Sequence, residues 1–334
     1  MPVRTILYTI IVVFMCVSIL TVTHTYTFIT TPSSPPRSLL VEISPGTSAW
    51  EISRQLEAKG IITDASMFMI IATLTGKVTH LQAGTYVFEG RHYPMDIMHI
   101  LFKGRTLKYR VTIPEGCTIF DVASIVAETG LLTREEFFLS AQDPETTAFF
   151  GIDVPSMEGF LYPDTYYLAP HMTPKEIMGK MVDRFHEVFT NDMLRRAHEL
   201  DMSVAQVVTL ASIIEKEAVM SSSEKPIISS VFHNRLKRKM RLQSDPTAVY
   251  GIDGFRRKIL SRDLKRDTPY NTYLYGGLPP GPICNPGVKS IRAALWPSDT
   301  KYLFFVSKGN GSHYFSRSLS EHTNAIRSMA SANK

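Results

Sequence analysis

Residues 203–219, "SVAQVVTLASIIEKEAV", predict a helix that is buried on almost every side. Consecutive residues step about 100° around a helix axis, and here apolar side chains occupy nearly the whole circumference. Two glutamates, Glu215 and Glu217, stand close to the end of this helix. They lie about 200° apart around the axis, so they cannot form a pair of carboxylates that acts on one bond.

Both glutamates have apolar neighbours on the helical wheel. Burial among apolar groups raises the pKa of an unpaired carboxyl, and a raised pKa suits a general acid that works near neutral pH. The alternative is that each glutamate is paired with a nearby arginine. Periodicity alone leaves both possibilities open and does not choose between Glu215 and Glu217.

The segment that follows, "SVFHNRLKRKMRLQSDPTAVYG" (230–251), predicts a second helix and then a turn at Pro246. Asn234 and Arg235 fall on the polar side of that helix, and Asp245 is expected to cap what comes after it. Amide, carboxylate and phenol groups close to a glutamate suit sugar hydroxyls and acetamido groups. The alternative is that Asn234 is a surface residue and Asp245 only a cap.

Residues 5–22, "TILYTIIVVFMCVSILTV", carry no charge and predict a membrane-spanning helix over 5–23. Arg4 precedes it and nothing basic follows closely, so residues 1–4 are expected to form a cytoplasmic tip. A cleaved signal peptide is the alternative, but no small-residue cleavage motif is present. We therefore expect a single-pass anchor in the cell inner membrane, with the rest of the chain periplasmic or otherwise extracytoplasmic.

The composition, with 334 residues and 44% apolar side chains, excludes a disordered chain. Between residues 234 and 266 there are eleven Lys or Arg and three acidic residues, yet they belong to no nucleic-acid-binding motif. No nucleic acid is expected outside the membrane, so a solvated face is favoured, with contact to anionic lipid or wall polymer second. The three cysteines lack metal-ligand spacing, so no metal is expected, and whether Cys117 and Cys284 pair is left open.

A pattern in "VEISPGTSAWEISRQLEAKGIITDASMF" (41–68) returns in "VTIPEGCTIFDVASIVAETGLLTREEFF" (111–138). Each predicts a strand, a turn and two capped helices, although shared capping by chance is the alternative. The first copy belongs to a module that resembles the LysM-like fold, which binds amino-sugar polymers. The expected class is α+β, with a linker at 24–38, the LysM-like module at 39–104, a second strand–helix–helix unit at 105–148 and a larger domain at 149–334.

Four motifs together closely resemble the YceG-like endolytic murein transglycosylases, over most of the chain from about residue 39. They are "ASIIEKEA" (211–218), the 230–251 segment, "EGFLYPDTY" (158–166) and "YNTYLYGGLPPGPICNPG" (270–287). In the family's A-S-I-x-E-K-E motif the second glutamate is catalytic, which corresponds to Glu217. Glu215 and Glu224 are implied to support it, although one extra residue between Glu217 and Glu224 departs from the family pattern. The residues expected to bind substrate are Glu158, Tyr162, Asp164, Asn234, Arg235, Gln243, Asp245, Thr247, Tyr250, Asn271 and Tyr273.

The resemblance implies cleavage of the β-1,4 bond between N-acetylmuramic acid and N-acetylglucosamine inside glycan strands, leaving 1,6-anhydro ends and limiting the elongation of nascent glycan. It implies no cofactor, and its partners would be glycan strands and the peptidoglycan synthases of elongation or division. One alternative is a muramidase-type hydrolase with Asp164 or Asp245 as second carboxylate. The other is a wall-binding scaffold without catalysis.

Overall fold

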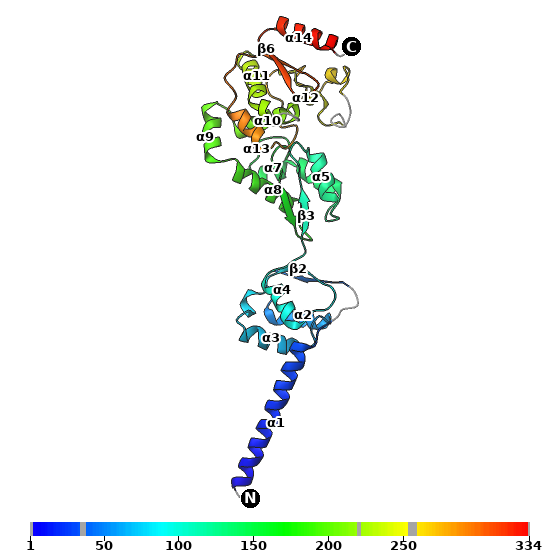
Figure 1. Cartoon of the computed structure of the whole chain (residues 1–334), viewed down its shortest axis with the longest axis vertical. Helices are drawn as coiled ribbons and strands as arrows, with labels where there is room; N and C mark the ends of the chain where they lie inside the picture. Colours follow the sequence, from blue (N-terminus) through cyan, green and yellow to red (C-terminus); the bar gives the residue numbers. More distant parts are fainter. Residues whose placement is uncertain (1–2, 34–37, 219–221, 253–258, 333–334) are drawn as a thin grey trace. The chain divides into compact units, whose positions relative to one another are not determined.

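The computed structural model describes residues 3–33, 38–218, 222–252 and 259–332 (Figure 1). The predicted tip at 1–4, the linker at 24–38 and the basic stretch at 234–266 lie partly outside the described residues. The chain divides into two compact units, Met1–Tyr109 and Arg110–Lys334. It is a mixed α+β protein with one N-terminal apolar helix.

Helix α1 (Val3–Thr30) contains 26 consecutive residues, Thr5–Thr30, that are long and apolar enough to cross a membrane. The helix continues past residue 23, where a linker was expected. Threonine hydroxyls in this part donate back to carbonyls four residues earlier, as Thr30 does to Tyr26, which satisfies the hydroxyls but does not favour the helix. Phe28 is buried in the core of the first unit, and this packing stabilises the helix locally.

The first unit pairs strand β1 (Leu39–Ile43) antiparallel with β2 (Gly84–Phe88), so that Val41 lies opposite Tyr86. Both of these side chains are fully buried. The strands enclose one core with three helices, α2 (Ala49–Ala58), α3 (Ala65–Leu74) and α4 (Pro94–Phe102), and a short 3-10 turn, η1 (Val78–His80). Ser48 and Asp64 cap α2 and α3 through their side chains, whereas the repeat pattern predicted a threonine, Thr63, as the cap of α3.

The second unit opens with the expected strand and two helices, β3 (Tyr109–Thr112), α5 (Ile119–Ala127) and α6 (Arg134–Gln142), followed by α7 (Pro144–Phe149). Strand β3 pairs with β4 (Thr165–Leu168). The strand that pairs with β3 lies beyond residue 149. Buried residues of 110–148 and of the segments that follow belong to one hydrophobic core.

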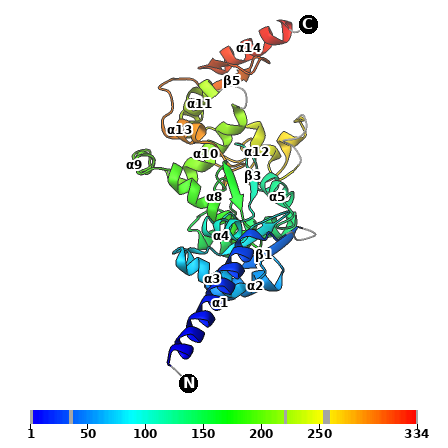
Figure 2. The same cartoon turned by 60° about the horizontal axis from the view of Figure 1, so that its bottom comes forward.

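The remaining helices surround α10 (Val204–Glu217), which lies inside the second unit (Figure 2). Residues 174–199 form two helices and not one, because Thr190 caps the second of them. The helices around α10, including the 3-10 helices η2 and η4, are α8 (Pro174–Val188), α9 (Asn191–Glu199), η2 (Ser222–Glu224), α11 (Lys225–Lys237), α12 (Asp245–Val249), η4 (Asp263–Lys265) and α13 (Val288–Leu295).

The last part of the second unit is a hairpin followed by a helix. Strand β5 (Phe304–Ser307) pairs antiparallel with β6 (His313–Ser316), and α14 (Leu319–Ala332) packs on both strands. Cys117 and Cys284 are both free, and Cys284 is buried against the backbone of α10, where its thiol contacts the Ser212 carbonyl.

Candidate active site

Helix α10 positions the two glutamates on different sides of its last turn. Ser203 caps its first turn, and the Gln206 side chain accepts a hydrogen bond from the Ser203 backbone N–H in return. From Val207 to Glu215 every side chain of α10 is buried. The helix is therefore fixed on all sides, and the directions in which its end residues point are fixed with it.

Glu215 is bound entirely to protein groups. Its carboxylate accepts hydrogen bonds from Lys225 Nζ at 2.9 Å, the Gly287 backbone N–H at 3.1 Å and Ser290 Oγ at 2.6 Å. The ion pair with Lys225 is almost fully buried, with 9% and 5% of the two side chains exposed. Glu215 thus ties α10 to α11 and α13.

Glu217, the last residue of α10, instead borders an open cavity of about 450 Å³. Its carboxyl accepts a hydrogen bond of 2.5 Å from Ser244 Oγ. Burial raises the pKa of Glu217 to about 7, the hydrogen bond from Ser244 opposes this rise, and the charge of Asp245 adds to it. A carboxyl with this pKa holds a proton in a large fraction of molecules near neutral pH.

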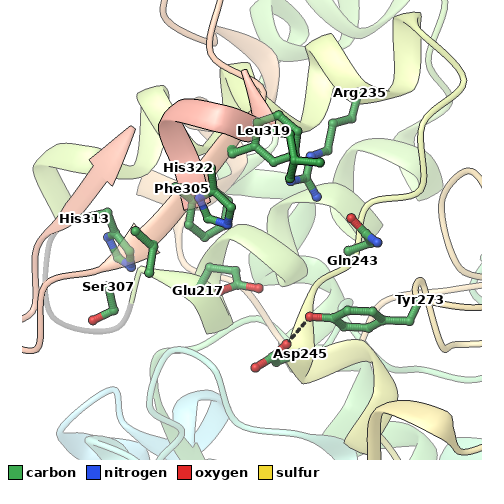
Figure 3. Close-up of a pocket in the computed structure, with 12 residues that line it drawn as sticks. Glu217, Arg235, Gln243, Asp245, Tyr273, Phe305, Ser307, His313, Leu319 and His322 are labelled. Carbon is green, nitrogen blue, oxygen red and sulfur yellow. Dashed lines mark hydrogen bonds between the residues drawn. The ribbon is translucent and has the colours of Figure 1, made fainter. Parts of the chain in front are cut away.

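The cavity has two walls, one on each side of Glu217 (Figure 3). One wall comes from α11 and from the segments around 243–245 and 273, and the other comes from the C-terminal hairpin and α14. The residues that line it are Glu217, Arg235, Gln243, Asp245, Tyr273, Phe304, Phe305, Val306, Ser307, His313, Leu319 and His322.

The first wall depends on an alternation along residues 242–246. Leu242, Ser244 and Pro246 are buried, whereas Gln243 and Asp245 are exposed. Both exposed side chains border the cavity: Gln243 has a left-handed backbone with φ of 48°, and Asp245 lies at the start of α12. Asp245 is the first residue of α12 rather than its cap, because Ser244 occupies the N-cap position.

Two further groups complete that wall. Asp245 accepts a hydrogen bond of 2.5 Å from the Tyr273 hydroxyl, which holds its carboxylate at the cavity edge. The Arg235 guanidinium is buried, donates to the carbonyls of Leu303 at 2.7 Å and Leu242 at 2.6 Å, and lies 5.2 Å from the centre of the Phe304 ring. A positive group near Glu217 favours its carboxylate form after it has given up a proton.

The structure therefore brings five of the expected residues to one cavity, namely Glu217, Arg235, Gln243, Asp245 and Tyr273. The other expected binding residues lie elsewhere within the described part of the second unit. Asn234 donates to the carbonyls of Thr300 and Tyr302 at 2.9 Å each, so its amide fastens α11 to the segment before β5. Asp164 forms an ion pair of 2.7 Å with Arg184.

Glu158 and Tyr250 meet each other inside the domain rather than at the cavity. The Tyr250 hydroxyl donates to Glu158 at 2.9 Å, and the same carboxyl receives the Ile119 backbone N–H and the Asn285 amide. Burial raises the pKa of Glu158 to about 8, against the lowering effect of these donors. Thr247 is fully buried within α12, Asn271 is fully buried in a turn, and Tyr162 is buried in the core.

Sequence analysis missed the second wall and the Ser244 hydroxyl. The segments "KYLFFVS" (301–307) and "HYF" (313–315) contribute to the second wall, and none of their residues was among those expected to bind substrate. His313 and His322, two side chains able to exchange protons near neutral pH, were the available signal. Glu224 lies behind this wall, where it binds His313.

Comparison with known proteins agrees with the motifs. The model of a family described as YceG-like matches residues 41–328. The endolytic murein transglycosylase of Bacillus subtilis (strain 168) is 31% identical over 304 residues, covering 85% of this chain and 83% of that protein. The endolytic murein transglycosylase of Streptococcus pneumoniae (strain R6) is 27% identical over 327 residues, covering 85% of this chain and 58% of that protein.

A crystal structure of a YceG-like protein from Listeria monocytogenes matches this fold with a TM-score of 0.60 and 34% sequence identity. The match covers 86% of this chain and 98% of that one. The fold and the cavity thus define a class of protein in which a glutamate at the end of a buried helix borders an open site, with the Asp245 carboxylate beside it. The chain belongs to the YceG-like family.

Proposed function

We propose that this protein is an endolytic murein transglycosylase with Glu217 as its catalytic acid. Relatives of that name align with 85% of the chain. One observation supports Glu217 as the catalytic residue: its carboxyl borders the 450 Å³ cavity. The Glu215 carboxylate instead accepts hydrogen bonds from Lys225, Gly287 and Ser290.

The reaction begins with proton donation to the leaving oxygen. Glu217, protonated because burial raises its pKa to about 7, gives its proton to the glycosidic oxygen as the bond to the muramoyl anomeric carbon breaks. The C-6 hydroxyl of the same muramoyl unit attacks that carbon and closes a 1,6-anhydro ring. The hydroxyl proton is returned to the Glu217 carboxylate by the end of the cycle, so the carboxyl is regenerated and no water is consumed.

The groups around Glu217 suit the charge changes of this reaction. The transition state of glycosidic cleavage carries positive charge at the anomeric carbon, and the Asp245 carboxylate borders the same cavity. Ser244 and Arg235 favour the Glu217 carboxylate that exists between the two proton transfers. The polar groups of Gln243 and Tyr273 are available to the sugar hydroxyls.

A hydrolase is the competing function, because Asp245 lies in the cavity and could position water. Asp164 is a poorer second carboxylate, since it is engaged by Arg184 away from the cavity lining. The products separate the two reactions: transglycosylation leaves anhydro ends, and hydrolysis leaves reducing ends.

The first unit supports a wall-bound location. Its order of strand, two helices and strand, with β1 antiparallel to β2, suits a LysM-like module that holds glycan, and α1 suits a single-pass anchor. With Arg4 ahead of the anchor, the N-terminus would lie in the cytoplasm and the catalytic domain outside the inner membrane. Peptidoglycan synthases of elongation or division are the proposed protein partners.

The test is mass spectrometry of glycan products from Glu217→Gln and Glu215→Gln variants. The amide of Glu217→Gln cannot donate a proton, so we expect anhydro ends to fall by about 10²–10⁴-fold or more with the melting temperature preserved. Glu215→Gln is the matched control and should lose stability before chemistry. An active Glu217→Gln beside a folded but inactive Glu215→Gln would reverse the assignment.

A further inference from the structure

One carboxylate holds both the ring and the backbone of a histidine in the second wall of the cavity. Nδ1 of His313 lies 2.7 Å from Glu224 Oε2, and the backbone N–H of His313 donates to Glu224 Oε1 at 3.2 Å. Only 11% of the His313 side chain and 17% of the Glu224 side chain are exposed. The ring therefore has one fixed orientation.

The orientation decides which ring nitrogen can exchange a proton. With the Nδ1 hydrogen directed at Glu224, the neutral imidazole keeps its lone pair on Nε2. Phe305 and Phe315 border the ring, with centroids 5.5 Å and 6.3 Å away, and both limit its rotation.

His313 and Glu217 border the same cavity from different walls (Figure 3). Glu224, at the start of α11, contacts His313 directly. The other titratable and charged groups that line the cavity with His313 are Glu217 on α10, Arg235 on α11, Asp245 on α12, Tyr273 and, on α14, His322. A sugar bound between the walls would meet a proton donor on one side and an imidazole on the other.

We propose that His313, oriented by Glu224, accepts the proton of the attacking sugar hydroxyl while Glu217 donates its proton to the leaving oxygen. This inference rests on the proposed function and assigns its second proton transfer to a residue other than Glu217. The bond from the anomeric carbon to the leaving oxygen breaks, and the bond to the C-6 oxygen forms. The hydroxyl proton moves to Nε2, and it returns through the cavity to the Glu217 carboxylate before the next cycle.

Two groups that must start in opposite states give a bell-shaped dependence of rate on pH. His313 must be neutral, so protonation of the imidazole lowers the rate on the acid side. Glu217 must be protonated, so its ionisation lowers the rate on the alkaline side. If Glu217 carried both transfers alone, the acid side would show no contribution from His313.

The experiment uses the full chain in detergent and measures the initial rate of product formation from purified glycan strands between pH 5 and 9. His313→Gln should lower the rate about 10²–10⁴-fold and remove the decline on the acid side, while the alkaline decline stays. Glu224→Gln should also lower the rate, because the ring loses the carboxylate that fixes its orientation. His198→Gln, an exposed histidine on α9, is the matched control and should match the wild type.

A rate and pH profile of His313→Gln equal to those of the wild type would overturn the inference. If His313→Gln fails to fold, a wild-type profile without an acid-side decline, or a Glu224→Gln profile identical to it, would overturn the inference equally. Mass spectrometry of the same reactions distinguishes failure of the role proposed for His313 from failure of the proposed function. Reducing ends in place of anhydro ends would refute transglycosylation, while the pH comparison would still decide whether His313 accepts the nucleophile's proton.

Discussion

Removing the Ser244 hydroxyl should raise the pKa of Glu217, whereas neutralising Asp245 should lower it. Ser244 Oγ donates to the Glu217 carboxyl at 2.5 Å and favours its charged form. The Asp245 carboxylate repels that charged form. The two residues are neighbours in sequence and border the same acid, so the variants Ser244→Ala and Asp245→Asn form a pair with opposite expected signs.

The size of each shift follows from the contact that is lost. A hydrogen bond to a charged group contributes about 1.5–3 kcal/mol, and one pKa unit corresponds to about 1.4 kcal/mol. Water can enter the open cavity and replace part of the Ser244 contact, so Ser244→Ala should raise the pKa of Glu217 by about one unit from its value near 7. A like charge near a half-buried acid acts on a similar scale, so Asp245→Asn should lower it by about half a unit to one unit.

The assay is the initial rate of anhydro-end formation between pH 5.5 and 9. A general acid must be protonated, so the rate falls about tenfold per pH unit above its pKa. The alkaline decline should begin at higher pH in Ser244→Ala and at lower pH in Asp245→Asn. Ser307→Ala removes a hydroxyl of the same cavity that does not bond Glu217, and it should leave the position of the decline unchanged. Shifts in one direction for both variants, or no shift in either, would refute the assignment of this decline to Glu217.

Three further expectations concern stability. The pKa of Glu158 is raised to about 8 in the folded state, so its contribution to the free energy of unfolding is greatest below the unfolded value of about 4.5 and is lost as pH rises through 8. The side chain of the Glu158→Gln variant does not ionise, so the fall in unfolding free energy with pH should be smaller, by about 3 kcal/mol at pH 7. Denaturant titration at several pH values measures this difference. Lys225→Met should cost about 3–5 kcal/mol by leaving the Glu215 carboxylate buried without its cation, and adding Glu215→Gln should restore part of that in thermal unfolding. Asn234→Ala should cost about 1–3 kcal/mol through the two carbonyls it leaves unpaired, while the KM for glycan stays within twofold because the amide does not line the cavity.

The elements of the fold were predictable where one face of a segment had to be buried. The apolar circumference of α10 required a core position, and the caps of α2 and α5 follow from Ser48 and Thr118. The helical wheel also separated Glu215 from Glu217, since their directions around α10 differ. It could not decide which side would meet an open cavity, because the groups on each side come from segments far along the chain.

The binding residues were harder to predict because closeness in sequence does not determine direction. Tyr250 follows Asp245 by one turn of helix, yet it points to Glu158 in the interior. Asn234 and Arg235 are neighbours, yet only Arg235 reaches the cavity. Such directions depend on tertiary packing against Phe304 and the segment before it, which a local pattern does not contain.

The second wall of the cavity has a consequence for the timing of synthesis. With α1 as an anchor and the rest of the chain exported, as we propose, α10 and its glutamate would emerge well before β5, β6 and α14. Until those last elements are made and packed, the carboxyl has no opposing wall, and the buried setting that keeps it protonated is incomplete. An enzyme built in this way would not cleave the surrounding glycan during its own export. It would become active only when its C-terminal hairpin has folded.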